Sequence, residues 1–391
     1  MKEDLPQGNS TQLAANSIWD EAEPENFFEL RQEFFTTFPQ KVWEFAQRHG
    51  HTGDKEDIGA LIRFLNERVS RIEGTLTPVT VRNWLTKGPP SARSREQVYQ
   101  LCFALELPVD EVDEFFIKAY WDRPFDFKEP YECVYWFCIK SGIPYRRARE
   151  LLKRVESEGT SGAGRAEAYT AQIEMDIREL DSEEDLLYYM RTRSDVFSSR
   201  NVTARQEALA LMEECRDIAD QLDERYLTSQ YLADERAGKR KNLNLKEKKR
   251  SDDRLLEAVY GVNQRRVEEK ARVYQGWTFS FPAYVRRCFP QAPQLQQIRA
   301  GAATYDTIRK ALIMLKFYSF YGDQKLNGMD ENGQYGDFDL FMAEVNGMLV
   351  RCGYGELYYR NPYDYLFCYC AAGEDPLGKL QDCVEAYWDE K

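Results

Sequence analysis

Histidine is almost absent from this sequence, which has 391 residues and only two histidines, His49 and His51. A catalytic triad with a histidine base would depend on one of these two residues. The nine cysteines are an odd number and include no Cys-x-x-Cys pair, so neither a structural zinc site nor a disulfide framework is indicated. We therefore expect a protein that is not an enzyme and that uses no metal, no cofactor and no small-molecule substrate.

Long apolar segments are also lacking. No run approaches the roughly 18 consecutive apolar residues of a membrane-spanning helix. The N-terminal sequence MKEDLPQGNSTQLAAN has no apolar core of the kind found in secretory signals. Most cysteines lie in apolar, aromatic runs such as ECVYWFCI, which favours buried free thiols in a reducing compartment. We expect a cytoplasmic protein without a membrane partner.

Positive charge is in the minority, with 53 Lys and Arg against 66 Asp and Glu, for a net charge of −13. This balance disfavours wrapping of the whole chain by nucleic acid. Hydrophobic residues make up 43% and aromatic residues 14%, which is typical of a globular chain. Few segments alternate with a period of two and many have helical spacing, so we predict an all-α fold.

Changes in composition divide the chain into four parts. Residues 1–56 form an acidic N-terminal helical segment with a net charge of −6. Residues 57–157 form a first helical module, and residues 277–391 form a second. Between them, residues 158–276 begin with a small-residue linker, continue as long polar helices and contain a basic run over 239–250. We predict two related helical modules joined by a long helical middle region.

The second module repeats a motif of the first. The segment EPYECVYWFC is similar to NPYDYLFCYC at a constant offset of 232, which aligns Pro130 with Pro362 and Glu132 with Asp364. Matching apolar positions follow in both copies, so an internal duplication is favoured over chance similarity. Because proline is favoured at the first position of a helix, both prolines are predicted to open equivalent helices.

The duplication makes two further predictions. Residues 94–150 and 304–388 are predicted to superpose as helical hairpins. The aligned thiols of Cys138 and Cys370 lie at matching apolar positions and are predicted to be buried and unpaired.

A helix-turn-helix pattern occupies residues 75–116. Thr77 or Pro78 can begin a helix, and Gly88, followed by two prolines, can end it. A second helix is predicted over about 94–106, with a third after it.

This block resembles the helix-turn-helix of the lambda-repressor-like (XRE-type) family, in which a recognition helix ends in Gly, a Pro-containing loop follows, and the next helix has a Leu/Ala-rich core. The residues that carry the resemblance are Val81, Trp84, Gly88, Pro90, Leu101, Ala104, Leu105 and Val109. The resemblance covers about 40 of the 391 residues, with a weaker second copy near 282–316. It implies a non-enzymatic DNA-binding regulator of phage or mobile-element type.

Local charge agrees with this interpretation. Residues 58–100 contain seven positive and three negative side chains. Asparagine can bond adenine through both side-chain atoms, lysine can reach guanine, and arginines in a following loop suit phosphates. The predicted DNA-contacting residues of the first copy are Thr80, Arg82, Asn83, Lys87, Arg93 and Arg95. Of these, Thr80, Asn83 and Lys87 are expected on one outward face, opposite Val81 and Trp84.

A second basic region, residues 282–316, contains six positive side chains and one negative one. Its candidates are Arg286, Arg287, Gln294, Gln297 and Arg299. The basic run over 239–250 adds phosphate-seeking candidates, namely Lys239, Arg240, Lys241, Lys248, Lys249 and Arg250. The two helix-turn-helix copies would read two half-sites of DNA about one helical turn apart.

The expected partner is therefore double-stranded DNA. The alternative is a protein–protein interaction or adaptor protein, such as a defence or counter-defence component, that uses the same helical modules. The acidic balance of the chain favours the adaptor, and its basic islands favour DNA. The acidic residues 1–56 either cover a basic surface in the absence of DNA or pack into the first module through FFELRQEFF and KVWEFA.

Overall fold

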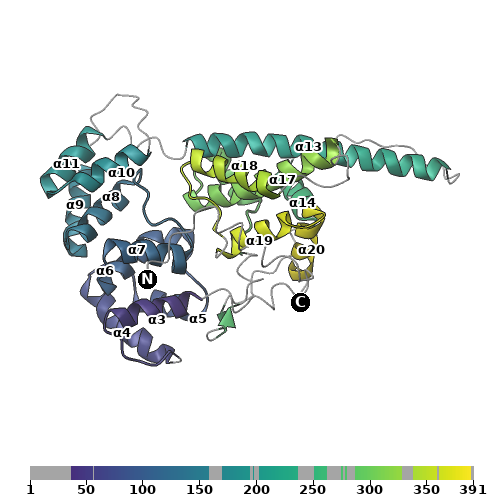
Figure 1. Ribbon diagram of the computed structural model, residues 1–391. Coiled ribbons are helices and arrows are strands. Elements are labelled where there is room, and N and C mark those ends of the chain that lie inside the picture. The colour runs from purple at the N-terminus through teal and green to yellow at the C-terminus, as the bar shows by residue number, and fades with distance from the viewer. Residues whose placement is uncertain are drawn as a thin grey trace. The chain divides into compact units, whose positions relative to one another are not determined.

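The regular secondary structure of the described residues is helical apart from one short strand pair, which confirms the all-α prediction (Figure 1). The computed structural model describes residues 37–55, 57–157, 170–193, 197, 202–236, 251–261, 274–275, 278–279, 287–327, 338–358 and 361–388. Within these ranges the exception is an antiparallel pair of two-residue strands, β1 (Tyr274–Gln275) and β2 (Thr278–Phe279). No helix in the described ranges has the length and apolar character needed to cross a bilayer.

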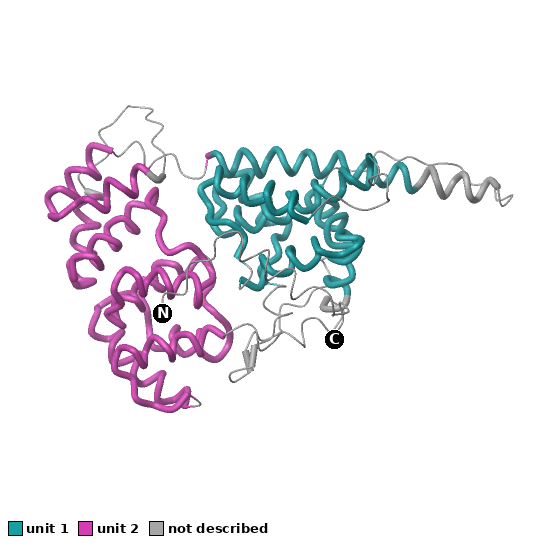
Figure 2. Tube along the Cα trace, viewed as in Figure 1, with its two compact units in different colours: residues 1–31, 203–271, 281–391 teal, residues 32–202, 272–280 magenta. Residues whose placement is uncertain are grey.

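The chain divides into two compact units (Figure 2). Unit 1 comprises residues 1–31, 203–271 and 281–391, and unit 2 comprises residues 32–202 and 272–280. Each unit is described by itself below.

Unit 2 is built from short helices. They are α3 (Phe38–Arg48), α4 (Ile58–Arg71), α5 (Pro78–Thr86), the 3-10 turn η2 (Ala92–Ser94), α6 (Arg95–Leu105), α7 (Val109–Phe115), the π-helical turn η3 (Phe116–Tyr120), α8 (Pro130–Lys140), α9 (Tyr145–Ser157), α10 (Thr170–Glu179) and α11 (Glu183–Thr192). Helices α5, α6 and α7 begin where the helix-turn-helix pattern predicts them.

Helix α3 packs into unit 2. Its capping residue Thr37 accepts a hydrogen bond from the backbone N–H of Gln40 at 3.3 Å. The ring of Phe38 lies 6.3 Å from that of Trp84 in α5, and the Phe45 ring lies 5.2 Å from that of Phe115 in α7. The motif KVWEFA is therefore part of the same core as the helix-turn-helix pattern, contrary to the boundary expected after residue 56. FFELRQEFF lies outside the described residues.

The middle region predicted over 158–276 is divided between the two units. Helices α10 and α11 pack with α8 and α9 in unit 2. The Lys140 ammonium at the end of α8 donates to the backbone carbonyls of Arg178 and Leu180, at 2.7 and 3.0 Å. These two carbonyls lie at the end of α10, where helix carbonyls have no partner within the helix. The expected small-residue linker and the basic run over 239–250 lie outside the described residues.

Unit 1 is centred on one long buried helix. Its helices are α13 (Val202–Arg236), α14 (Asp252–Tyr260), α16 (Ala292–Ala300), α17 (Tyr305–Asn327), α18 (Phe338–Arg351), α19 (Pro362–Ala371) and α20 (Pro376–Trp388). Helix α17 packs against α18, α19 and α20. A Cβ atom at Gly322 would lie 2.7 Å from Cγ2 of Ile218, so this glycine permits the close crossing of α17 and α13. The Phe317 ring contacts those of Phe341 and Phe367, which joins α17 to α18 and α19.

Pro130 opens α8 and Pro362 opens α19, which confirms the predicted helix starts. The aligned acids Glu132 and Asp364 are both buried, and each carboxylate accepts the backbone N–H of the residue six positions earlier. Five α-helices run from α5 to α9 in unit 2, with the proline-started α8 as the fourth. Five run from α16 to α20 in unit 1, with the proline-started α19 as the fourth. Superposition of residues 94–150 on 304–388 stays a prediction.

All nine cysteines are free, and all but Cys352 are buried, which confirms the prediction for Cys138 and Cys370. Burial raises the pKa of Cys138 to about 12 and that of Cys352 to about 11. Because the thiolate is the reactive form, we expect a thiol reagent to label native protein slowly and only at Cys352. The other cysteines should react on unfolding, which mass spectrometry with and without denaturant can measure. Rapid native labelling of Cys138 or Cys370 would contradict this expectation.

Candidate nucleic-acid interface

The local sequence determines where α5 begins and ends. The Thr77 side chain accepts the backbone N–H of Thr80 at 3.2 Å, and Pro78 occupies the first helical turn. After the helix, the backbone N–H of Gly88 donates to the carbonyl of Asn83 at 3.3 Å. Both ends lie where the sequence predicts them.

One face of α5 is buried and holds the helix in place. Val81, Trp84 and Leu85 are between 1% and 6% exposed. They pack α5 against α3 and α4, while α6 packs against α4. The opposite face of α5 is therefore presented on a supported helix.

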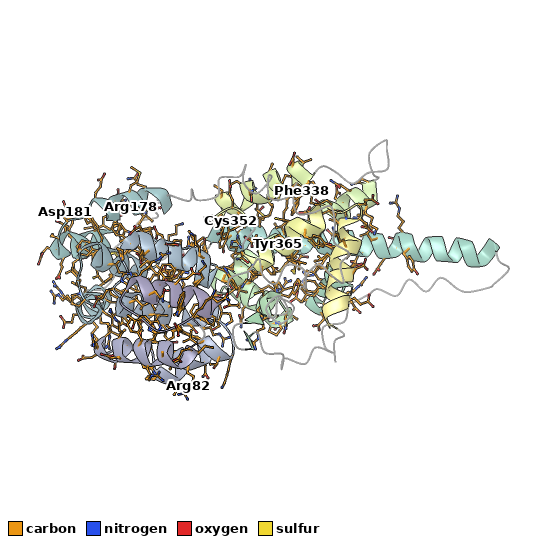
Figure 3. All side chains as sticks on the ribbon, turned by 60° about the horizontal axis from the view of Figure 1, so that its bottom comes forward. Arg82, Arg178, Asp181, Phe338, Cys352 and Tyr365 are labelled. Atoms are coloured by element: carbon orange, nitrogen blue, oxygen red, sulfur yellow. The ribbon has the colours of Figure 1, made fainter. Side chains whose placement is uncertain are left out.

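The exposed face of α5 differs from the predicted face of Thr80, Asn83 and Lys87. Val79 is 67% exposed and Arg82 and Lys87 are exposed, whereas Asn83, like Thr80, is half-buried. Figure 3 shows Arg82 at the outer edge of its unit. Thr80 is half-buried at the flank, with its hydroxyl 2.9 Å from that of Thr77. The helical spacing that places Val81 and Trp84 inward also places Val79 outward, whereas the predicted face contained only polar residues.

The cations on and beside α5 differ in their availability. Arg82, Lys87 and Arg93 are exposed, and their side chains make no ion pair or hydrogen bond with any residue that the structure describes. The three arginines of α4 each lie near an acid: Arg63 near Asp57, Arg68 near Glu106 and Arg71 near Glu67. Among the cations of α4, α5 and the loop that follows, those available to a ligand therefore lie on α5 and in the loop.

Arg95 has a structural role instead of the predicted phosphate contact. Its guanidinium donates to Glu132 at 2.7 and 2.9 Å and to Asp122 at 3.0 Å. It also donates to the hydroxyl of Tyr99 at 3.2 Å and to the backbone carbonyl of Arg123 at 2.9 Å. The side chain is 12% exposed, so its donors are used within unit 2.

The Tyr99 hydroxyl takes part in the same buried cluster. Burial raises the pKa of Tyr99 well above its usual value, so the hydroxyl stays protonated. It donates to Glu132 at 2.7 Å. The cluster thereby joins α6 to the start of α8.

The candidates of the second copy are mostly engaged within unit 1. The Gln294 side chain accepts the backbone N–H of Gln291 at 3.2 Å, and Gln297 is half-buried. Arg299 donates to Asp252 of α14 at 2.8 Å, so its guanidinium is engaged within unit 1, and its DNA contact stays a prediction. Arg287 is exposed. Arg286, together with Lys239, Arg240, Lys241, Lys248, Lys249 and Arg250, lies outside the described residues.

A side chain of α13 caps the C-terminal end of α16. Arg205 donates to the backbone carbonyl of Ile298 at 2.8 Å and also to that of Arg299. Two further cations of this region form ion pairs, Arg309 with Asp364 and Lys316 with Glu344. In the described part of the second copy, most cations are therefore engaged within unit 1.

No known protein family matches the chain, and no curated protein or solved structure matches it. Within the described ranges, no group of three His, Cys, Asp or Glu side chains is placed to hold a metal ion. The exposed face of α5, with Arg93 beside it, remains the strongest candidate site.

Proposed function

We propose that unit 2 binds double-stranded DNA through the exposed face of α5. The class of protein would be a helix-turn-helix DNA-binding regulator, as the resemblance to the lambda-repressor-like family implies. The particular function would be that of a non-enzymatic regulator of phage or mobile-element type. The observation that carries the proposal is the set of three exposed cations, Arg82, Lys87 and Arg93, on a supported helix and its loop, none of which has an ion-pair partner among the described residues.

The chemistry of the face suits the major groove. Asn83 can bond adenine through its amide, and the exposed Val79 can contact the methyl group of thymine. Arg82 and Arg93 would contact phosphates, which position the protein without reading sequence. Lys87 at the end of the helix would reach guanine or a phosphate. Because the second copy is largely engaged within unit 1, one reading helix per chain is proposed.

Fluorescence anisotropy with mixed genomic DNA fragments, at low and moderate salt, tests the proposal. Replacing Arg82, Lys87 and Arg93 together by Ala should reduce the slope of log affinity against log salt by about 2–3, because each phosphate contact contributes about 0.9. Asn83→Ala should cost about 1–3 kcal/mol at one base position of a selected site and leave the salt slope unchanged. Arg191→Ala is the matched control, since it removes an exposed charge from α11 in the same unit.

Two results would contradict the proposal. One is a triple variant that binds DNA as the wild type does. The other is wild-type protein that fails to bind DNA at low salt, which would favour the adaptor function instead.

A further inference from the structure

Helix α18 has an exposed apolar stripe. Its inner face, which includes Phe341, Val345 and Leu349, is buried against α17 and α19. On the other side, Leu340 is 52% exposed and Val350 is 56% exposed. Figure 1 shows α18 at the surface of unit 1, and Figure 3 labels Phe338 at its start.

Small residues occupy the middle of this stripe. Ala343 and Gly347 lie between Leu340 and Val350, at the spacings that align residues along one helix face. A glycine inside a helix lowers its stability relative to alanine. Among the described residues, a Cβ atom at Gly347 would meet only the Arg351 guanidinium, at 3.5 Å, which is an ordinary contact. The packing of unit 1 therefore does not require glycine there, whereas close approach of another backbone would.

The stripe complements itself when two copies run antiparallel. In a pair centred at the level of Val345, Leu340 lies opposite Val350 of the second copy and Ala343 lies opposite its Gly347. The exposed Asp339 in the first turn then lies at the same level as the exposed Arg351 in the last turn of the other helix. The antiparallel arrangement thus places the acidic end of each helix beside the basic end of the other.

We propose that α18 pairs with α18 of a second copy of this chain to form a two-fold symmetric homodimer. A symmetric dimer needs a patch that is complementary to itself, and the stripe has this property in both its apolar and its charged positions. One helix pair buries less than the roughly 800 Å² per partner of a standard interface, so the dimer should be weak and dependent on concentration. The proposal is independent of DNA binding by α5.

Sedimentation equilibrium of the full chain over a wide range of concentration tests the dimer. The average mass should rise from 45.8 kDa toward twice that value. Leu340→Lys and Gly347→Leu should each weaken association at least tenfold, because one places a charge in the apolar stripe and the other blocks close approach. Tyr226→Lys is the matched control, since Tyr226 is 63% exposed on α13, and it should associate as the wild type does.

Charge reversal tests the antiparallel orientation. Asp339→Arg and Arg351→Asp should each weaken self-association roughly threefold to tenfold, because each places like charges together twice in the dimer. An equal mixture of these two variants should recover association, since opposite charges then meet at both ends. A wild-type chain that stays monomeric, or stripe variants that associate as Tyr226→Lys does, would overturn the proposal. Circular dichroism should show that every variant is folded.

Discussion

Glu132→Gln is expected to lower the free energy of unfolding of unit 2 by about 3–5 kcal/mol, because it leaves a buried arginine without its main counter-charge. The Glu132 side chain is 1% exposed. Besides Arg95 and Tyr99, it accepts the backbone N–H of Asp126 at 2.6 Å and the hydroxyl of Tyr131 at 2.8 Å. The amide of glutamine matches this carboxylate in size but offers one acceptor oxygen and no charge.

Urea unfolding, combined with hydrogen exchange of peptides from α6 and α8, can measure this loss. Glu67→Gln is the control: it removes an acid that is 67% exposed and paired with Arg71 on α4, and it should cost at most about 0.5 kcal/mol. Equal effects of the two changes would show that the buried cluster contributes no more than a surface pair.

The parts of this fold that the sequence predicts are those with local causes. Thr77 with Pro78, Pro130 and Pro362 all start helices where expected, since capping and proline geometry act within a few residues. The buried stripe of α5 likewise follows from helical spacing alone. The exposed face opposite that stripe was predictable only in part: Lys87 is exposed as expected, but Thr80 and Asn83 are half-buried and Val79 is exposed.

The parts that the sequence does not predict depend on distant partners. Arg95 and Arg299 are arginines in basic segments, where a contact with DNA is predicted. The acids with which they form ion pairs, however, lie far away in the sequence. The partner of Arg95 is Glu132, 37 residues away, and that of Arg299 is Asp252, 47 residues away. Neither periodicity nor local charge indicates which cations the fold will use for itself.

Asp364→Asn should likewise lower the free energy of unfolding of unit 1, by about 3–5 kcal/mol. The Asp364 side chain is fully buried, and Arg309 donates to both of its oxygens, at 2.7 and 2.6 Å. The backbone N–H of Tyr358 also donates to it at 2.9 Å. An asparagine would present an NH2 group to one of these donors and leave the Arg309 guanidinium, which is 12% exposed, without its ion-pair partner.

The effect of Asp364→Asn should be concentrated where the ion pair lies. Hydrogen exchange is expected to accelerate in α17 and α19 and to stay unchanged in α6 and α8, because every contact that is lost lies within unit 1. Asp382→Asn, an exposed change on α20 of the same unit, should alter stability by no more than about 0.5 kcal/mol. If Asp364→Asn and Asp382→Asn unfold at the same urea concentration, the buried pair does not stabilise unit 1. A large loss in both Glu132→Gln and Asp364→Asn would mean that the aligned acids perform the same structural task, each joining a proline-started helix to an arginine of an earlier helix.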